Sequence, residues 1–382
     1  MWVRFAEVRL HPIIRVEPEG YKFDMQSNLE IKDKCKFFLH GHYPFSTTEY
    51  FKELSESTII GKDPDRYGQG SDLQKFEKEL SDFFGFEDCI FLQSGTMAQL
   101  IALRIWSDQK NNSLVAFHPT CHLELHEQMA YKKLHNLDST LVGKSDALIN
   151  IDDLKKIDTS PGTILLELPQ REIGGQLPQW SDLLNQTEYL RSRNIAIHLD
   201  GARVWECAPF YGRNYKEITG LFDSVYVSFY KGIGAVSGAA LLGSAEFIEK
   251  ARIWNRRHGG NLVTSFPVYS SAKHNFHKRI NRFESYFAKT KEISEELSKI
   301  SGIKINPKVP QVNMFHLIIE GEESQLRKKA LEASKNTKIW GFARLQKVPN
   351  SSFCKFEWYV GDATIDLTTE EIVDYVKMVV AN

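Results

Sequence analysis

The chain has 382 residues, of which 42% are hydrophobic, 25% charged and 12% aromatic, so it is neither a single small module nor a disordered chain. Its 48 Lys and Arg against 49 Asp and Glu leave a formal charge of −1, which argues against binding nucleic acid or an anionic membrane through an overall field. The five cysteines form no CxxC pair, and charges interrupt the N-terminal stretch where a secretory signal would be apolar. We therefore expect a cytoplasmic protein.

Secondary structure becomes predictable after the N-terminal segment, residues 1–60, whose one unusual feature is His40-Gly41-His42. Ser71 and Gln74 have the spacing of a capping box, and the apolar residues after them predict a helix that ends at Gly85. A short apolar strand over 89–92, the turn Ser94-Gly95-Thr96 and a helix-forming run over 97–106 follow. This order is strand, tight turn and helix.

Four further apolar runs predict strands, at 163–168, 195–199, 224–229 and 239–242. The segments between the first three runs are long enough for crossover helices, which indicates a mainly parallel sheet. We therefore predict a large α/β domain over residues 61–265.

From residue 266 onward the pattern predicts a smaller α+β domain, residues 266–382. The predicted elements are one long polar helix over 277–300, helices over 323–334 and from 368, and strands near 312–319, 339–343 and 356–360. The N-terminal segment is expected to contribute to this domain or to the active site.

Ser94-Gly95-Thr96 precedes a helix N-terminus, where free backbone N–H groups and the helix dipole favour a phosphate. Such short strings are common, so a structural turn with a Thr cap explains it about equally well. Asp200 follows a buried strand, at the edge where open α/β sheets bind ligands, although a carboxylate there could also cap the next helix.

Lys231 follows a strand so apolar that its amine should be partly desolvated at the strand's rim. Desolvation lowers the pKa of an amine and makes it a nucleophile toward aldehydes. Asp200 and Lys231 are 31 positions apart, the length of one strand-crossover-strand unit, so adjacent strands would present both to one pocket. With the turn at Gly95, they meet three demands of pyridoxal phosphate: a phosphate cup, an amine for its aldehyde, and an acid for its ring nitrogen.

The chain resembles the threonine aldolase and β-eliminating lyase family of fold-type I pyridoxal-phosphate enzymes, from about residue 60 to 265. The matching strings are Tyr67-Gly68, Ser94-Gly95-Thr96, His122 after Cys121, Leu166-Glu167 with Gly174-Gly175 and Leu177-Pro178, Asp200-Gly201-Ala202-Arg203, Lys231-Gly232 with Gly238, and Gly259-Gly260.

The resemblance implies a role for each matching residue. Lys231 would form the Schiff base and Asp200 would pair with the pyridine nitrogen. The Ser94-Gly95-Thr96 turn would bind the phosphate through Gly95 and Thr96, and His122 would stack on the ring. Arg203 would lie beside the phenolic oxygen and help to bind the substrate carboxylate, with Tyr67 also near the substrate. A second subunit completes the active site in this family, so a homodimer or homotetramer is implied.

Three departures from the family concern the substrate. Where the family has Asn-Thr-His-Asn, this chain reads Leu168-Pro169-Gln170-Arg171, so Gln170 replaces an imidazole and cannot serve as a general base. The family's N-terminal Arg-Ser-Asp-Thr segment is missing, and His40 or His42 could supply polar groups instead. The arginine that binds the substrate carboxylate from the C-terminal region is also not evident, and Arg171 and Arg344 are candidates.

Other patterns favour simpler interpretations. His122, Glu124 and His126 lack the zincin order, so we predict no metal and assign His126 to the pocket lining or the core. Gly232, Gly234 and Gly238 miss the dinucleotide fingerprint by one position. The basic cluster Arg252, Arg256, Arg257 and His258 fits a solvated helix face or a phosphate contact across a dimer interface.

The predicted function is that of a lyase cleaving threonine or allo-threonine to glycine and acetaldehyde. The substrate amine would displace Lys231, Arg203 would orient the carboxylate, and His126 or a water held by Gln170 would take the hydroxyl proton. Two alternatives remain: β-elimination, in which Lys231 removes the Cα proton, and a non-catalytic protein that binds the cofactor.

Overall fold

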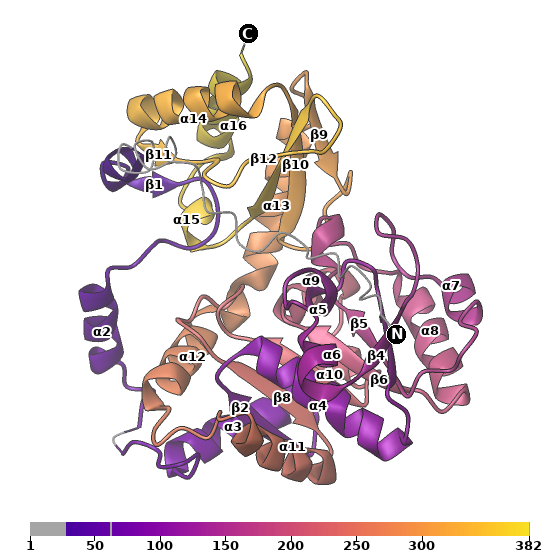
Figure 1. Ribbon diagram of the computed structural model, residues 1–382. Helices are drawn as coiled ribbons and strands as arrows, with labels where there is room; N and C mark the ends of the chain where they lie inside the picture. The colour runs from indigo at the N-terminus through magenta and orange to yellow at the C-terminus, as the bar shows by residue number, and fades with distance from the viewer. Residues whose placement is uncertain (1–27, 62, 382) are drawn as a thin grey trace, which may run out of the picture.

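The computed structural model describes residues 28–61 and 63–381, which form a large and a small lobe, each built on its own sheet (Figure 1). The large lobe holds a seven-stranded sheet in the order β2-β8-β7-β6-β5-β3-β4. Its strands are β2 Asp88–Leu92, β3 Leu114–Phe117, β4 Asp138–Leu141, β5 Thr163–Glu167, β6 Ala196–Gly201, β7 Ser224–Ser228 and β8 Ala239–Gly243.

The pairs from β4 across to β7 are parallel, and β8 is antiparallel to both of its neighbours. Strands β6, β7 and β8 are buried along their whole length, which explains why they read as continuous apolar runs. The predicted mainly parallel α/β sheet is therefore confirmed.

Strands β3 and β4 were not predicted. Each has only four residues, and β4, with the sequence DSTL at the sheet edge, is partly exposed and carries no apolar run. An edge strand can be polar because only one of its sides pairs with the sheet. The sheet is consequently two strands wider than predicted, although β3, with the sequence LVAF, does carry a short apolar run.

Helices cover the sheet of the large lobe (Figure 1). They are α3 Ser71–Phe84, α4 Gly95–Lys110, α5 His122–Leu125, α6 Ala130–His135, α7 Ile151–Lys155, α8 Trp180–Ser192, α9 Ala208–Tyr211, α10 Tyr215–Thr219 and α11 Ala245–Arg257. Helix α3 ends at Gly85 as predicted, with φ 79°. The predicted capping box is wrong, because Ser71 is already helical and the N-cap is Gly70, which has no side chain to accept a bond. No helix in the described ranges is both long and apolar enough to span a bilayer.

The small lobe contains the antiparallel sheet β12-β13-β10-β9. Its elements are β9 Ile303–Asn306, β10 Met314–Glu320, α14 Glu323–Thr337, β11 Ile339–Trp340, β12 Gln346–Lys347, β13 Phe353–Tyr359, α15 Asp362–Ile365 and α16 Thr369–Val380. Strand β1, Phe37–Phe38, pairs with β11, so part of the N-terminal segment joins this lobe. Helix α2, Thr47–Glu56, lies instead beside the large lobe (Figure 1). The domain boundaries at residues 60 and 265 stay predictions.

The single helix predicted over 277–300 is wrong. The chain instead forms α12 Phe266–Arg279, a 3-10 turn over Ile280–Arg282, and α13 Phe283–Leu297. No Gly or Pro marks this break, so the sequence pattern runs through it. At the break, Arg279 and Arg282 both bind Asp362 of the small lobe, and this tertiary contact accompanies the turn.

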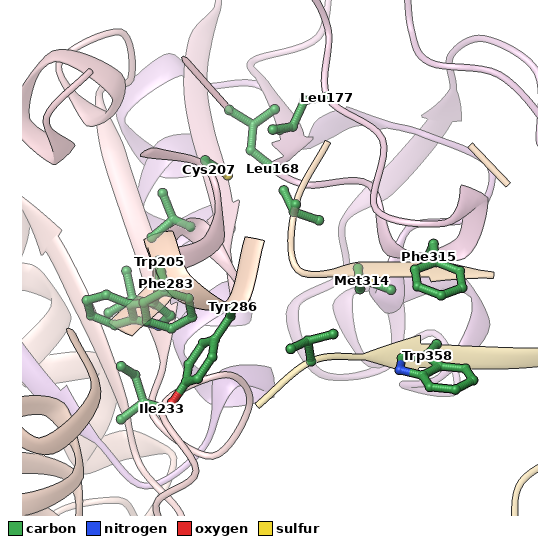
Figure 2. Close-up of a cluster of buried hydrophobic side chains, with 14 of the residues drawn as sticks. Leu168, Leu177, Trp205, Cys207, Ile233, Phe283, Tyr286, Met314, Phe315 and Trp358 are labelled. Carbon is green, nitrogen blue, oxygen red and sulfur yellow. The ribbon is translucent and has the colours of Figure 1, made fainter. Parts of the chain in front are cut away.

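The two lobes share one apolar core. Trp205 and Phe283 are buried beside Ile233 and Tyr286, and the cluster continues to Met314, Phe315 and Trp358 of the small lobe (Figure 2). Burying one such side chain contributes about 1.5–3 kcal/mol. The lobes are therefore packed together, and polar groups of the small lobe can reach the strand ends of the large one.

Candidate active site

A cavity opens at the carboxyl ends of the central parallel strands, the edge where open α/β sheets bind ligands. Residues from the ends of β5 and β6, from the loop after β7 and from the start of α4 meet there. Its lining is Gly95, Thr96, Gln99, Thr120, His122, His126, Glu127, Glu167, Arg171, Glu172, Asp200, Ala202, Arg203, Tyr226, Tyr230 and Lys231.

Lys231 and Asp200 reach this cavity from neighbouring strands. Asp200 lies near the end of β6, Lys231 follows β7, and β6 and β7 pair in parallel. Burial, together with the charges of Arg203 and Arg171, lowers the pKa of Lys231 from 10.5 to about 8. A useful fraction of this amine is therefore uncharged near neutral pH, as imine formation with an aldehyde requires.

Asp200 is a buried carboxylate that has no ion-pair partner within 4.0 Å in the described part of the chain. It is 3% exposed, and it accepts hydrogen bonds from Gln99 Nε2 at 2.5 Å and from the N–H of Ala202 at 3.1 Å. Burial raises its pKa, and no Lys, Arg or His of the described ranges forms an ion pair with it. A protonated ring nitrogen would supply the missing positive charge. This pocket therefore fits the pyridine end of pyridoxal phosphate.

The start of α4 fits an anion. The Ser94 hydroxyl accepts the N–H of Met97 at 3.3 Å and so caps the helix, whereas Gly95 and Thr96 line the cavity with first-turn N–H groups that have no partner within the helix. A Cβ on Gly95 would overlap the hydroxyl of Tyr226, so only glycine allows this close approach. The cap is thus Ser94 rather than Thr96, and Ser94 itself lies outside the lining.

Two histidines predicted for the site are held by carboxylates. His122 Nδ1 lies 2.8 Å from Glu127 Oε1, and His126 Nε2 lies 3.1 Å from Glu172 Oε1. Both imidazoles line the cavity, with ring centroids 5.0 Å apart. Each ring is therefore oriented by a contact with a carboxylate.

The two arginines of the cavity differ in their ion pairs with carboxylates of the protein. Arg171 lies 2.8 Å from Glu172 and 2.7 Å from Glu357, a residue of β13 in the small lobe. For Arg203, the one carboxylate within 4.0 Å among residues 28–61 and 63–381 is that same Glu357. Although burial opposes the charge of Arg203, nearby carboxylates raise its pKa, so it stays protonated. Arg203 therefore keeps donors for a substrate carboxylate.

Glu167 is a site residue that sequence reasoning did not assign. It lines the cavity, and its carboxylate accepts hydrogen bonds from Gln170 Nε2 at 2.9 Å and from the N–H of Arg171 at 3.1 Å. Burial and the charge of Asp200 raise its pKa to about 8. A signal for it was available in the sequence. Glu167 ends a predicted strand and belongs to Leu166-Glu167, one of the strings that match the family.

Besides Ser94, the predicted residues Gln170, Tyr67 and Arg344 lie outside the cavity lining. Gln170 is buried and its amide binds Glu167 and Thr120, so it is not free to hold a water at the substrate. Tyr67 lines a separate hollow of about 510 Å³ together with Arg252 and other residues of the predicted basic cluster. Arg344 is exposed on the small lobe.

Comparisons with known proteins identify the family of the chain. The family model described as β-eliminating lyase matches residues 47–320. Low-specificity L-threonine aldolase 1 of Arabidopsis thaliana is 24% identical over 68% of this chain and 75% of its own length.

Two solved structures are similar over nearly the whole chain. A Listeria monocytogenes protein provisionally named an L-allo-threonine aldolase is 38% identical with a TM-score of 0.88, covering 93% of this chain and 98% of that chain. A protein of Exiguobacterium sp. 255-15, provisionally named an aromatic amino acid β-eliminating lyase/threonine aldolase, is 38% identical with a TM-score of 0.87, covering 92% and 98%.

Proposed function

The chain belongs to the β-eliminating lyase family, and from that premise we propose that it is a pyridoxal-phosphate-dependent lyase that cleaves threonine or allo-threonine to glycine and acetaldehyde. The observation that carries this proposal is that Lys231 and Asp200, borne by adjacent parallel strands, open into one cavity. Several similar proteins are named threonine aldolases, which favours a small β-hydroxy-α-amino acid as the substrate.

Five residues would hold the cofactor. Lys231 would bind its aldehyde, Asp200 its ring nitrogen, and Gly95 and Thr96 its phosphate, with His122 against the ring. When bound, pyridoxal phosphate supplies an electron-accepting ring that takes up the electron pair of the bond being broken.

The remaining residues would act on the substrate. Arg203 would bind its carboxylate and so fix the orientation of the Cα–Cβ bond. His126 would accept the proton of the β-hydroxyl, with Glu172 holding the ring and stabilising the charge that it gains. Lys231, with a pKa of about 8, can give or accept a proton near neutral pH.

β-Elimination is the second candidate function. Gln170 stands where an imidazole is expected, and its amide is already bound to Glu167. An amine with a pKa of about 8, as for Lys231, suits removal of a Cα proton near neutral pH. An oxygen or sulfur group on Cβ would then leave.

The two functions give different products, so one assay separates them. Purified protein loaded with pyridoxal phosphate is incubated with the four threonine isomers and, separately, with serine and cysteine derivatives. Aldol cleavage releases glycine and acetaldehyde, whereas β-elimination from serine or cysteine derivatives releases pyruvate and ammonia. Pyruvate without any glycine would refute the aldolase function.

We also propose that the chain forms a homodimer or a homotetramer. Tyr67, Leu262, Val263 and Phe266 are 50%, 42%, 58% and 43% exposed, and the N–H of Tyr67 donates to the carbonyl of Val263 at 2.9 Å. Neighbouring exposed apolar groups of this kind favour association. Light scattering should give a dimer or tetramer mass, and Val263→Asp should shift the population toward the monomer.

A cytoplasmic location is also proposed. All five cysteines are unpaired, and Cys89, Cys121, Cys207 and Cys354 are buried. Free thiols of this kind persist in a reducing compartment. Cell fractionation with an antibody against the chain would test the location.

A further inference from the structure

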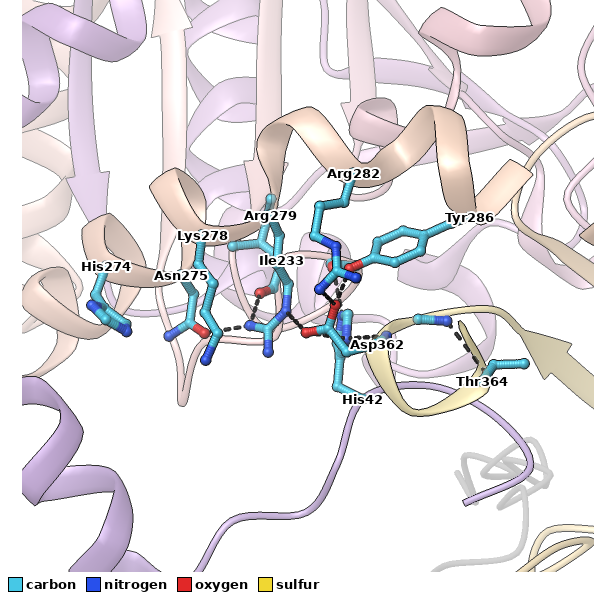
Figure 3. A network of polar contacts seen from close by, with 12 residues as sticks. His42, Ile233, His274, Asn275, Lys278, Arg279, Arg282, Tyr286, Asp362 and Thr364 are labelled. Atoms are coloured by element: carbon cyan, nitrogen blue, oxygen red, sulfur yellow. Dashed lines mark hydrogen bonds and ion pairs between the residues drawn. The ribbon is translucent and has the colours of Figure 1, made fainter. Parts of the chain in front are cut away.

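The two residues that follow Lys231 are held by donors from distant parts of the chain. His42 Nε2 lies 2.8 Å from the carbonyl oxygen of Gly232, and Arg279 Nη1 donates to the carbonyl of Ile233 at 2.8 Å. His42 comes from the N-terminal segment and Arg279 from α12. Successive carbonyls after the amine-bearing residue are thus fixed from two directions, and Figure 3 shows the contact between Arg279 and Ile233.

The same two side chains also bind Asp362, the first residue of α15 in the small lobe. Arg279 Nε donates to Asp362 Oδ2 at 2.8 Å, and the N–H of Asp362 donates to His42 Nδ1 at 3.1 Å (Figure 3). Arg282 and the hydroxyl of Tyr286 bind the other carboxylate oxygen. Although burial opposes it, these contacts lower the pKa of Asp362, which therefore stays ionised. The loop after Lys231 is consequently connected to the small lobe.

His42 has the hydrogen-bonding pattern that this position requires. A carbonyl oxygen can only accept, so Nε2 must carry the proton that points to Gly232. Nδ1 then accepts the N–H of Asp362 in the neutral ring. Nδ1 also lies 3.5 Å from Asp362 Oδ2. The ring therefore links the carbonyl of Gly232 to Asp362.

The ring of His42 is also confined by backbone on both sides. A Cβ on Gly234 would lie 2.8 Å from His42 Cδ2, and a Cβ on Gly361 would lie 2.8 Å from Nδ1. The N–H of Gly41 donates to the carbonyl of Tyr359 at 2.9 Å, which anchors the preceding residue to β13. The side chain of His42 is 11% exposed. Its ring can therefore act as a rigid spacer.

We propose that His42 is a positioning residue for Lys231. By holding the carbonyl of Gly232 against the small lobe, it fixes the loop that carries the amine, although His42 itself does not line the cavity. The inference rests on the proposed function only in taking Lys231 as the residue that binds the cofactor. It gives a role to His42 of the His40-Gly41-His42 string, which has no part in the proposed reaction.

Two substitutions separate the two bonds of the ring. In His42→Gln, the side-chain amide can still donate to Gly232. In His42→Asn, the shorter amide can accept the N–H of Asp362 but cannot reach Gly232. Full-length protein loaded with pyridoxal phosphate is followed by pH titration of the cofactor's absorption band and by hydrogen exchange of the peptide that contains Gly234 and Ala235.

We expect His42→Asn to shift the titration midpoint and to speed amide exchange in this peptide about 3- to 10-fold, the effect of losing one hydrogen bond. We expect His42→Gln to stay within about twofold of the unaltered protein. His274→Asn is the matched control, because His274 also ties α12 to the N-terminal segment, through Ser57 and Glu53, but away from Lys231. It should lower the melting temperature and leave the titration unchanged.

The outcomes distinguish this inference from the proposed function. If His42→Asn leaves both the titration midpoint and the exchange of the loop unchanged, or if the Asn and Gln variants behave alike, the positioning role is wrong. If the unaltered protein shows no lysine-linked cofactor band, the proposed function fails and this inference fails with it. A normal band that shifts only in His42→Asn supports the positioning role, whatever amino acid the enzyme cleaves.

Discussion

Glu167 and Asp200 end neighbouring parallel strands in the same register, so two carboxyl groups lie side by side at the base of the cavity. Two adjacent buried carboxylates are unfavourable, and burial with the charge of Asp200 raises the pKa of Glu167 to about 8. The pair therefore keeps a proton on Glu167 near neutral pH. This arrangement lets Asp200 remain the ionised partner of a protonated ring nitrogen.

This proton makes stability depend on pH. The Glu167 carboxyl has a pKa of about 8 in the folded protein against 4.5 ordinarily, so between these values the unfolded chain binds fewer protons and stability falls as pH rises. Glu167→Gln removes this titration while keeping a neutral group of the same size. Between pH 5 and pH 9, we expect the free energy of unfolding of the unaltered protein to fall by about 1–3 kcal/mol more than that of the variant.

Urea unfolding at several pH values measures this difference. Glu322→Gln is a suitable control, because its side chain is 68% exposed and should not change the pH dependence. Equal slopes of stability against pH in the Glu167→Gln variant and the unaltered protein would show that Glu167 ionises normally.

Substitutions of Lys231 and Asp200 should have different effects, the first on attachment of the cofactor and the second on kcat. Lys231→Ala removes the amine, so borohydride should no longer fix the cofactor to the chain. Asp200→Asn keeps the size of the side chain but removes the charge, so the cofactor should still be fixed to Lys231 while kcat falls about 100- to 1000-fold. Mass mapping after reduction and steady-state kinetics give both results. Cofactor fixed to another lysine in the unaltered protein would contradict the site.

The sequence allowed this part of the site to be predicted because its chemistry is local. Asp200 and Lys231 each follow an apolar run, and the ends of adjacent parallel strands meet at one edge. Glu357 could not be found in this way. It reaches Arg171 from β13 of the other lobe, and the pairing depends on how the lobes pack rather than on any nearby pattern.

The same distinction explains the errors in the fold. Helix α3 was located by its apolar spacing and by Gly85, both of which are local signals. The break over Ile280–Arg282 was missed because it coincides with contacts to Asp362, 80 positions from Arg282. Tertiary contacts of this kind leave no periodic signal in the sequence.

The two arginines of the cavity should differ in their effect on substrate binding. Arg203→Gln should raise KM about 10- to 100-fold, because the ion pair of Arg203 with Glu357 is long, at 4.0 Å, and leaves charged donors for the substrate carboxylate. Arg171→Gln should raise KM much less, since Glu172 and Glu357 already occupy this guanidinium. Arg203→Gln should also raise the pKa of Lys231, because the charge of Arg203 destabilises the protonated form of this lysine.

Steady-state kinetics test this comparison, and the pH titration of the cofactor band tests the expected rise in the pKa of Lys231. An Arg171→Gln variant with the larger increase in KM would show that the substrate carboxylate displaces Glu357 and binds Arg171 instead. The pKa of Lys231 cannot decide between the two, because both arginines lower it.

His126 rather than Gln170 should carry the proton of the β-hydroxyl. His126 lines the cavity and Glu172 can stabilise its cation, whereas Gln170 lies behind the lining with its amide bound to Glu167. His126→Asn should therefore lower kcat for threonine about 100- to 10,000-fold and leave cofactor binding intact. Gln170→Ala should instead lower the melting temperature and change kcat by less than about tenfold, because it removes a buried hydrogen bond rather than a reacting group. If the two effects on kcat were reversed, the base would have to be sought on the β5 side of the cavity, at a water held by the loop that carries Gln170.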